Sequence, residues 1–389
     1  MWFGSFPSEH FDSRNKRLNK PTIYDSLGVS PIINAAGTFT DLGGSLMSAE
    51  VVAAWQAAAA HFVDLRELQK CVGDRIADML GVESVLVTGG AASGILLGTA
   101  AAITDRDPRF VNQQIVSSSG RPFEVIRQKA YREIYDRQVE TCGVQIIEVE
   151  SADQLSKVVS DQTVMMMAYN LYGSHSDIDH QTWLDFGRAR AIPTLLDASA
   201  DTPPVANLWR YARMGYDMVT FSGGKAIGGP QSSGLLVGRQ KWIELAQQNA
   251  VPNEGTIGRV AKVSKEDIVA LWKAVEIHLA EGDEIGDRCG RQLQTIADLL
   301  AETPAVDCQF ITPEVANHFP HLLLRWDETA LQLTSTELAR ELRLGPPPIA
   351  TGRVHGTGTA GCLISAINLK PGEERLVGNR IKEIIVARG

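Results

Sequence analysis

The chain of 389 residues exceeds the usual size of a single compact core, so we expect two lobes. Hydrophobic residues make up 44% and charged residues 21% of the chain, a balance that excludes a disordered protein. The formal net charge of -9 disfavours a broad basic face, and it therefore disfavours nucleic acid as a partner.

The start of the chain and its cysteines indicate a cytoplasmic protein. The first 17 residues lack the apolar run of a secretory signal peptide. An odd number of cysteines without CxxC spacing suits a reducing compartment, and we predict neither a disulfide framework nor a metal site. The five cysteines are Cys71, Cys142, Cys289, Cys308 and Cys362.

In chain order, the polar residues 1–30 are expected to form an N-terminal arm. An apolar stripe then predicts a helix over residues 64–80, which Gly81 ends. Residues 84–104 carry no charge, which invites a transmembrane interpretation. Because glycines and hydroxyl side chains interrupt this stretch, we interpret it as a buried strand, a tight turn and a buried helix.

Short apolar runs alternate with helical segments through the middle of the chain, which predicts an α/β sheet covered on both faces. The predicted strands are 84–88, 144–149, 164–169, 193–196, 218–221 and 234–237. The predicted helices that follow are 179–189, 240–248 and 264–281.

Beyond residue 290 the pattern indicates a smaller α+β lobe. Two strands are predicted, over residues 321–326 and 362–368. One helix is expected after Thr334, because Glu337 three residues later completes a capping box. Another is expected near Pro371, a residue suited to a first helical position. We therefore divide the chain into an arm (1–30), a large domain (31–285) and a small C-terminal domain (286–389).

The strongest local motif surrounds Lys225. A predicted strand ends at Phe221, small residues lead to the lysine, and two further glycines and a proline follow. Such a lysine is exposed at a strand end with little steric cover, which suits imine formation with a cofactor aldehyde. A solvated loop lysine is the alternative.

Asp197 strengthens the first interpretation. It ends a predicted buried strand, and the carboxyl ends of strands are where open α/β sheets bind ligands. Its carboxylate would keep the pyridinium nitrogen of pyridoxal 5′-phosphate protonated. The separation from Lys225 fits one intervening helix and a neighbouring strand. Asp201 competes for this role, and Asp197 could instead cap the following turn.

Two glycine-containing motifs lead to different conclusions. TGGAAS at 88–93 lies between a predicted strand and a predicted helix, where backbone amides could bind the cofactor phosphate. The GxGxxG at 356–361 precedes a strand and not a helix, so we do not interpret it as a dinucleotide site.

These motifs together resemble the bacterial selenocysteine synthase (L-seryl-tRNA selenium transferase) family of fold-type I pyridoxal phosphate enzymes. The likeness is closer to its shorter members, typified by D-glucosaminate-6-phosphate ammonia-lyase. The segments that carry the resemblance are FSGGKAIGGPQSSGLLVGR at 221–239, PIINAAGTF at 31–39, AYNLYG at 168–173, LLDASAD at 195–201, the stretch 258–275 and the helix–strand–turn segment 61–97.

The resemblance implies an aspartate aminotransferase-like large domain, a small C-terminal domain, and a homodimer or higher homo-oligomer with active sites at the interface. It makes Lys225 the imine lysine and Asp197 the partner of the pyridinium nitrogen. The remaining residues implied are Gly90, Ala91 and Ala92 at the phosphate, Ser222 as a further phosphate donor, Asn170 near the cofactor hydroxyl, Tyr131 stacked on the ring and Arg353 on a substrate carboxylate.

The sequence departs from the family at two points. Gly224 replaces the acidic residue that usually precedes the lysine, and the extra N-terminal region associated with tRNA is missing. We therefore predict a reaction at Cα and Cβ of an amino-acid-like substrate, either β-elimination of the ammonia-lyase type or β-replacement. An aminotransferase, an aldolase, a decarboxylase, a tRNA-dependent selenium transferase and a non-catalytic relative remain as alternatives.

Overall fold

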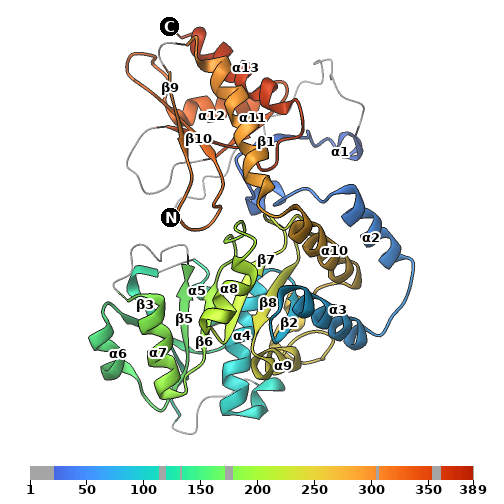
Figure 1. The fold of residues 1–389 in the computed structure, drawn as a ribbon, viewed down its shortest axis with the longest axis vertical. Coiled ribbons are helices and arrows are strands. Elements are labelled where there is room, and N and C mark those ends of the chain that lie inside the picture. The colour runs from blue at the N-terminus through green and yellow to red at the C-terminus, as the bar shows by residue number, and fades with distance from the viewer. Residues whose placement is uncertain are drawn as a thin grey trace.

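The computed structural model describes residues 22–113, 120–131, 134–170, 178–303, 306–352 and 361–388. The chain forms a larger and a smaller lobe (Figure 1). Most of the predicted N-terminal arm lies outside the described residues. Its described part contains the short helix α1 (Ile23–Ser26), which lies beside the smaller lobe in Figure 1.

A mixed sheet forms the centre of the larger lobe. Within the described residues it has seven strands in the order β2-β8-β7-β6-β5-β3-β4. Strand β8 runs antiparallel to both β2 and β7, whereas the strands from β7 to β4 pair in parallel. The strands are β2 (Ser84–Thr88), β3 (Glu124–Gln128), β4 (Gln145–Val149), β5 (Thr163–Tyr169), β6 (Thr194–Asp197), β7 (Met218–Ser222) and β8 (Gly234–Gly238).

Helices connect these strands and pack around the sheet (Figure 1). The helix α4 is almost entirely buried and contacts the sheet from β2 to β5. The helices of this lobe are α2 (Ala49–Ala59), α3 (Leu65–Leu80), α4 (Ala91–Arg106), α5 (Asp136–Glu140), α6 (Ala152–Val158), α7 (His180–Arg190), α8 (Asn207–Met214), α9 (Gln240–Gln248) and α10 (Lys265–Glu281).

The smaller lobe combines an antiparallel sheet with three helices. Its sheet has the order β12-β10-β9, and a parallel pair joins β1 to β11. The predicted capping box between Thr334 and Glu337 is confirmed. The elements are β1 (Ile33–Ala35), α11 (Glu284–Leu300), β9 (Val306–Ile311), β10 (His321–Trp326), α12 (Ser335–Leu344), β11 (Ile349–Thr351), β12 (Cys362–Ser365) and α13 (Glu373–Val386).

Two separate clusters of buried apolar side chains correspond to the two lobes. The first runs from Val51 to Val275, and the second contains most of the buried residues after Ile285. Strand β1 is the exception to this order along the chain, because Ile33 and Ala35 pack in the second cluster. The boundary at residue 285 stays a prediction.

The local predictions hold for the largely apolar strand segments and for the predicted helices of the larger lobe. All six predicted strands of the central sheet are present, and the predicted helices 64–80, 179–189, 240–248 and 264–281 are confirmed within one or two residues. Strand β3 went unpredicted because it carries Arg127 and Gln128, although both side chains are buried. The long helix α11 and strand β9 were also not predicted.

The uncharged stretch 84–104 forms β2, a turn and α4, as predicted. Among the described residues no helix is long and apolar enough to cross a membrane. No group of potential ligand side chains suited to a metal ion occurs in the same residues.

Close packing of α4 on β7 requires glycine at position 94. A Cβ added there would lie 2.1 Å from Thr220 Oγ1 and 2.9 Å from Thr220 Cβ. We expect Gly94→Ala to lower the free energy of unfolding by about 1–3 kcal/mol, the usual cost of overpacking a core. Chemical denaturation of the purified variants measures this.

The matched control is Gly290→Ala in α11, where the nearest heavy atom to an added Cβ is Pro320 Cγ at 3.9 Å. That substitution should be stabilising by about 0.5–1 kcal/mol, since it only restricts the unfolded chain and improves helix propensity. Equal effects of the two substitutions would contradict the packing described here.

Candidate active site

The candidate site begins at the carboxyl ends of β6 and β7. These strands pair in parallel, with Asp197 of β6 opposite Thr220 of β7. Asp197 ends its strand and is buried, and Lys225 follows the end of β7 by three residues. Helix α8 connects the two strands, so the predicted arrangement of one helix and a neighbouring strand is confirmed.

Backbone hydrogen bonds fix the loop that carries Lys225. The Gly223 N–H donates to the Ser233 carbonyl at 2.8 Å, and the Gly229 N–H donates to the Gly223 carbonyl at 2.8 Å. The Gly224 carbonyl accepts from the Ser45 N–H at 2.9 Å. A side chain at position 224 would lie 2.6 Å from Gln231 Cα, which gives a steric reason for glycine there in place of the acidic residue.

The amine of Lys225 donates to Ser199 Oγ, with Nζ and Oγ 3.2 Å apart. Burial lowers the pKa of Lys225, whereas the nearby carboxylates of Asp197 and Asp201 act in the opposite direction. A lowered pKa increases the fraction of the amine that is uncharged. Ser199 was not among the predicted site residues, and only its place two residues after Asp197 could have indicated it.

A second buried carboxylate lies close by. Asp201 Oδ2 accepts a hydrogen bond from Asn170 Nδ2, which also donates to the Tyr211 hydroxyl at 2.8 Å. Burial raises the pKa of Asp201 to about 6, although its hydrogen bonds with Asn170 and Tyr211 oppose this. The carboxyl group of Asp201 is therefore engaged by the side chains of Asn170, which follows β5, and of Tyr211 in α8.

Residues 88–92 span the end of β2, a short turn and the start of α4. Gly90 has a φ of 128°, which favours glycine, and an added Cβ would meet nothing within 4 Å. Gly90 is the N-cap of α4, and it has no side chain to accept from the first-turn N–H groups. Thr220 Oγ1 of β7 donates to the Ala91 carbonyl at 3.2 Å, which ties this turn to the strand that precedes Lys225.

The structure thus describes some of the predicted site residues and not others. The structure brings Asp197 and Lys225 together and connects the Gly90–Ala92 turn to the same strand. The Ser222 N–H donates to the Ser199 carbonyl at 3.2 Å. Tyr131 ends the short 3-10 helix Lys129–Tyr131, but its side chain lies outside the described part of the structure, as do Arg353 and most of 356–361.

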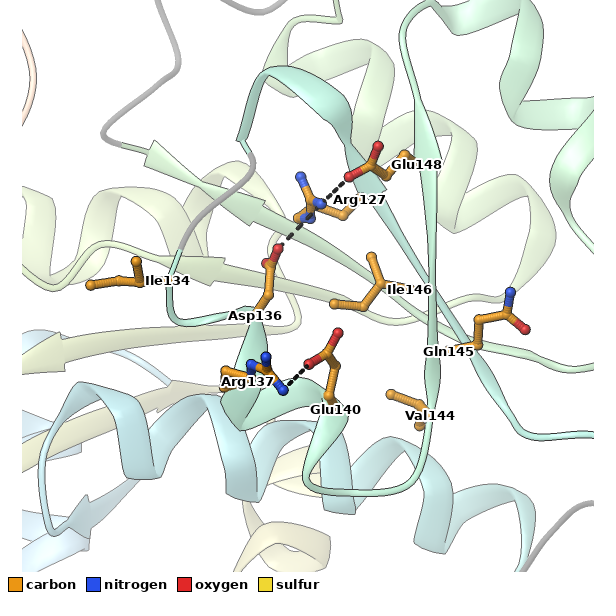
Figure 2. A pocket seen from close by; sticks show the side chains of 9 residues that line it. All are labelled: Arg127, Ile134, Asp136, Arg137, Glu140, Val144, Gln145, Ile146 and Glu148. Carbon is orange, nitrogen blue, oxygen red and sulfur yellow. Dashed lines mark hydrogen bonds and ion pairs between the residues drawn. The ribbon is translucent and has the colours of Figure 1, made fainter. Parts of the chain in front are cut away.

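A separate pocket of about 760 Å³ lies beside β3, β4 and α5 (Figure 2). Arg127 lines it and pairs with Glu148 at 2.6 Å and with Asp136 at 3.2 Å. Arg137 and Glu140 form a further ion pair at its wall. Neither Lys225 nor Asp197 lines this pocket, so we do not include it in the candidate site.

Comparison with known proteins identifies the family. A model of the L-seryl-tRNA selenium transferase family matches residues 32–303, which is more than half of the chain. The chain belongs to this family. The predicted resemblance is therefore confirmed.

The relatives of this chain are named for different reactions. D-glucosaminate-6-phosphate ammonia lyase of Salmonella typhimurium is 28% identical over 339 residues, which are 84% of this chain and 88% of that protein. The 5′-C-glycyluridine monooxygenase-decarboxylase of a Streptomyces species is 26% identical over 382 residues, covering 94% and 92%. A solved structure of D-glucosaminate-6-phosphate ammonia-lyase has a TM-score of 0.81 at 26% identity and covers 95% of this chain and 100% of that one.

These similarities confirm the predicted fold class, which is that of fold-type I enzymes with an α/β large domain. The family member is a pyridoxal phosphate-dependent enzyme of the lyase or transferase type. The roles of individual residues remain to be argued from the geometry of the candidate site.

The raised pKa of Asp201 generates a prediction about stability and pH. The carboxyl is harder to ionise in the folded chain, where its pKa is about 6, than at the ordinary value of 3.8. Between about pH 4 and pH 6 the carboxyl ionises in the unfolded chain but stays protonated in the folded chain, so the free energy of unfolding falls. The loss is complete above pH 6 and absent below about pH 4. Asp201→Asn removes the titration while keeping a similar shape.

As the pH rises from 4 to 7, the wild-type apoprotein should lose about 2–3 kcal/mol of unfolding free energy relative to Asp201→Asn. Urea denaturation of both proteins across this range measures the difference. A difference that does not change with pH would contradict the assigned environment of Asp201.

Proposed function

We propose that this protein holds pyridoxal phosphate on Lys225 and catalyses β-elimination of the ammonia-lyase type on an amino-acid-like substrate. The observation that supports the proposal is the pairing of β6 with β7, since Asp197 ends β6 and Lys225 follows the end of β7 by three residues. β-Replacement would use the same groups, with a nucleophile in place of water. Family membership and the ammonia lyase relative support this choice.

The residues present fit the cofactor. The cofactor supplies an aldehyde that condenses with amines and a ring that accepts an electron pair from Cα. Its phosphate would lie over Gly90, Ala91 and Ala92, where the backbone is open and the N-terminus of α4 favours an anion. Ser222 would donate to the same phosphate.

Asp197 would hold the proton on the ring nitrogen. It is buried, it ends β6 beside β7, and the Ser199 N–H donates to its Oδ1 at 2.8 Å. Asp201 is the competing carboxylate, but Asn170 already donates to it and its raised pKa disfavours the ionised form. Both observations support Asp197 for this role.

Lys225 would act as the base at Cα once the substrate amine has displaced it. Burial lowers the pKa of Lys225, so the released amine is uncharged at a lower pH than an exposed lysine. Asn170 would lie near the cofactor hydroxyl. Tyr131 would stack on the cofactor ring, and Arg353 would bind the substrate carboxylate.

The first test uses the purified holoenzyme and a panel of amino acids, including D-glucosaminate 6-phosphate. We expect release of a keto acid and ammonia from one of them without an acceptor keto acid. Lys225→Ala should lower this rate at least about a hundredfold, because it removes both the covalent attachment and the base. Lys241→Ala is the matched control, since Lys241 is exposed and pairs with Asp105.

The same assay separates the alternatives. Product formation only in the presence of an acceptor keto acid would contradict elimination and indicate an aminotransferase. Cleavage of the Cα–Cβ bond would indicate an aldolase, and loss of carbon dioxide would indicate a decarboxylase, a reaction named in the Streptomyces relative. A tRNA-dependent selenium transferase is favoured by the family and disfavoured by the charge of -9. Binding of seryl-tRNA at low salt would support it.

We further propose that the protein is cytoplasmic and a homodimer. Large apolar side chains are exposed on and beside α2, namely Trp55, Phe62 and Val63, and Val260 is 86% exposed. Val260 lies in the 3-10 helix Ile257–Ala261, whose Ala261 carbonyl is close to Gly89 in the candidate phosphate turn. A second copy that covered these side chains would lie beside the active site. Light scattering should give twice the monomer mass, and Phe62→Glu should lower it.

A further inference from the structure

Ser199 occupies a central place in the candidate site, although none of the roles described so far belongs to its side chain. It is half-buried and lies on the turn after β6, two residues beyond Asp197. Three of its atoms make hydrogen bonds to separate parts of the site. No other residue named in the candidate site contacts both Asp197 and Lys225 through hydrogen bonds of the described structure.

The three hydrogen bonds connect the two strand ends. The Ser199 N–H donates to Asp197 Oδ1 at 2.8 Å, and the Ser199 carbonyl accepts from the Ser222 N–H at 3.2 Å. The hydroxyl oxygen accepts from Lys225 Nζ at 3.2 Å. The first two bonds use the backbone, so they persist when the side chain changes. Only the contact with Lys225 depends on the hydroxyl.

We propose that Ser199 is a positioning residue for Lys225, whose amine it holds in one orientation beside Asp197. This inference rests on the proposed function, because it concerns the lysine that binds the cofactor. A lysine side chain has several rotatable bonds and loses much rotamer freedom when it is held. A hydroxyl that is fixed by a turn therefore excludes unproductive orientations of the Lys225 amine, from which reaction with the cofactor aldehyde would be slow.

The charges around Lys225 explain why a neutral acceptor suits this role. Asp197 from β6 and Asp201 from the following turn both attract a protonated amine. Tyr211 from α8 and Asn170, the residue after β5, hold the Asp201 carboxylate through hydrogen bonds. The serine hydroxyl directs the amine without adding a further negative charge, so it opposes deprotonation less than a carboxylate would.

The test measures how fast the apoenzyme takes up pyridoxal phosphate as a function of pH, followed by the visible absorbance of the bound cofactor. For the wild type, the midpoint of this profile reports loss of the proton from Lys225. Ser199→Ala should lower the plateau rate about three- to tenfold and shift the midpoint about 0.5–1 pH unit lower. The shift is downward because the hydroxyl oxygen stabilises the ammonium form more than the amine.

Two further variants separate the hydroxyl from the volume of the side chain. Ser199→Thr keeps an oxygen acceptor and should restore both the rate and the midpoint. Ser199→Cys keeps a side chain of similar size but offers only a weak acceptor, so its rate and midpoint should shift as predicted for Ser199→Ala. It also keeps the test decisive if the alanine variant folds poorly. Ser232→Ala is the matched control. Ser232 is exposed on the loop that carries Lys225, and its hydroxyl donates to Asp267 of α10.

The outcomes distinguish this inference from the proposed function. Profiles of Ser199→Ala and Ser199→Cys that coincide with the wild type would overturn the positioning role while leaving the cofactor on Lys225. Absence of uptake by the wild-type chain would overturn the proposed function, and the positioning role with it. Loss of rate in Ser199→Cys with recovery in Ser199→Thr supports the inference.

Discussion

The parallel pairing of β6 with β7 is the constraint on which the candidate site depends. It sets Asp197 opposite Thr220, and Thr220 in turn contacts the Ala91 carbonyl at the start of α4. Through these two contacts the carboxylate, the lysine loop and the glycine turn acquire fixed positions relative to one another. A shift of register by one residue would turn Asp197 to the other face of the sheet and would separate it from the lysine.

Hydrogen bonds connect the smaller lobe to the loops of the candidate site. Asn368 Nδ2 donates to the carbonyls of Gly37 and Gly44, and the next residue, Ser45, donates to the Gly224 carbonyl beside Lys225. On the other side the Asn317 N–H donates to the Ala200 carbonyl at 2.7 Å, within the turn that carries Asp197 and Asp201. The position of the smaller lobe and the geometry of the two strand ends are therefore linked by hydrogen bonds.

The sequence predicted those features of the site that depend on local pattern. Asp197 ends a largely apolar strand and Lys225 follows another, so their places at strand ends were evident. The hydrogen bond from Lys225 to Ser199 and the cluster of Asp201, Asn170 and Tyr211 were not predictable, because they join residues far apart in the chain. Strand β3 was not predicted for a related reason. The charge of its buried Arg127 is compensated by Glu148 on the neighbouring strand, a contact that the local sequence does not show. The pairing of β1 with β11 also joins distant segments, and its short strands give no pattern of their own.

Covalent attachment of the cofactor to the Lys225 amine is tested most directly by a single measurement. The holoenzyme is reduced with sodium borohydride, digested and examined by mass spectrometry for the peptide that carries the cofactor. We predict one modified peptide, with the pyridoxyl group on Lys225 and no modification of the other lysines. Modification of a different lysine, or of none, would contradict it.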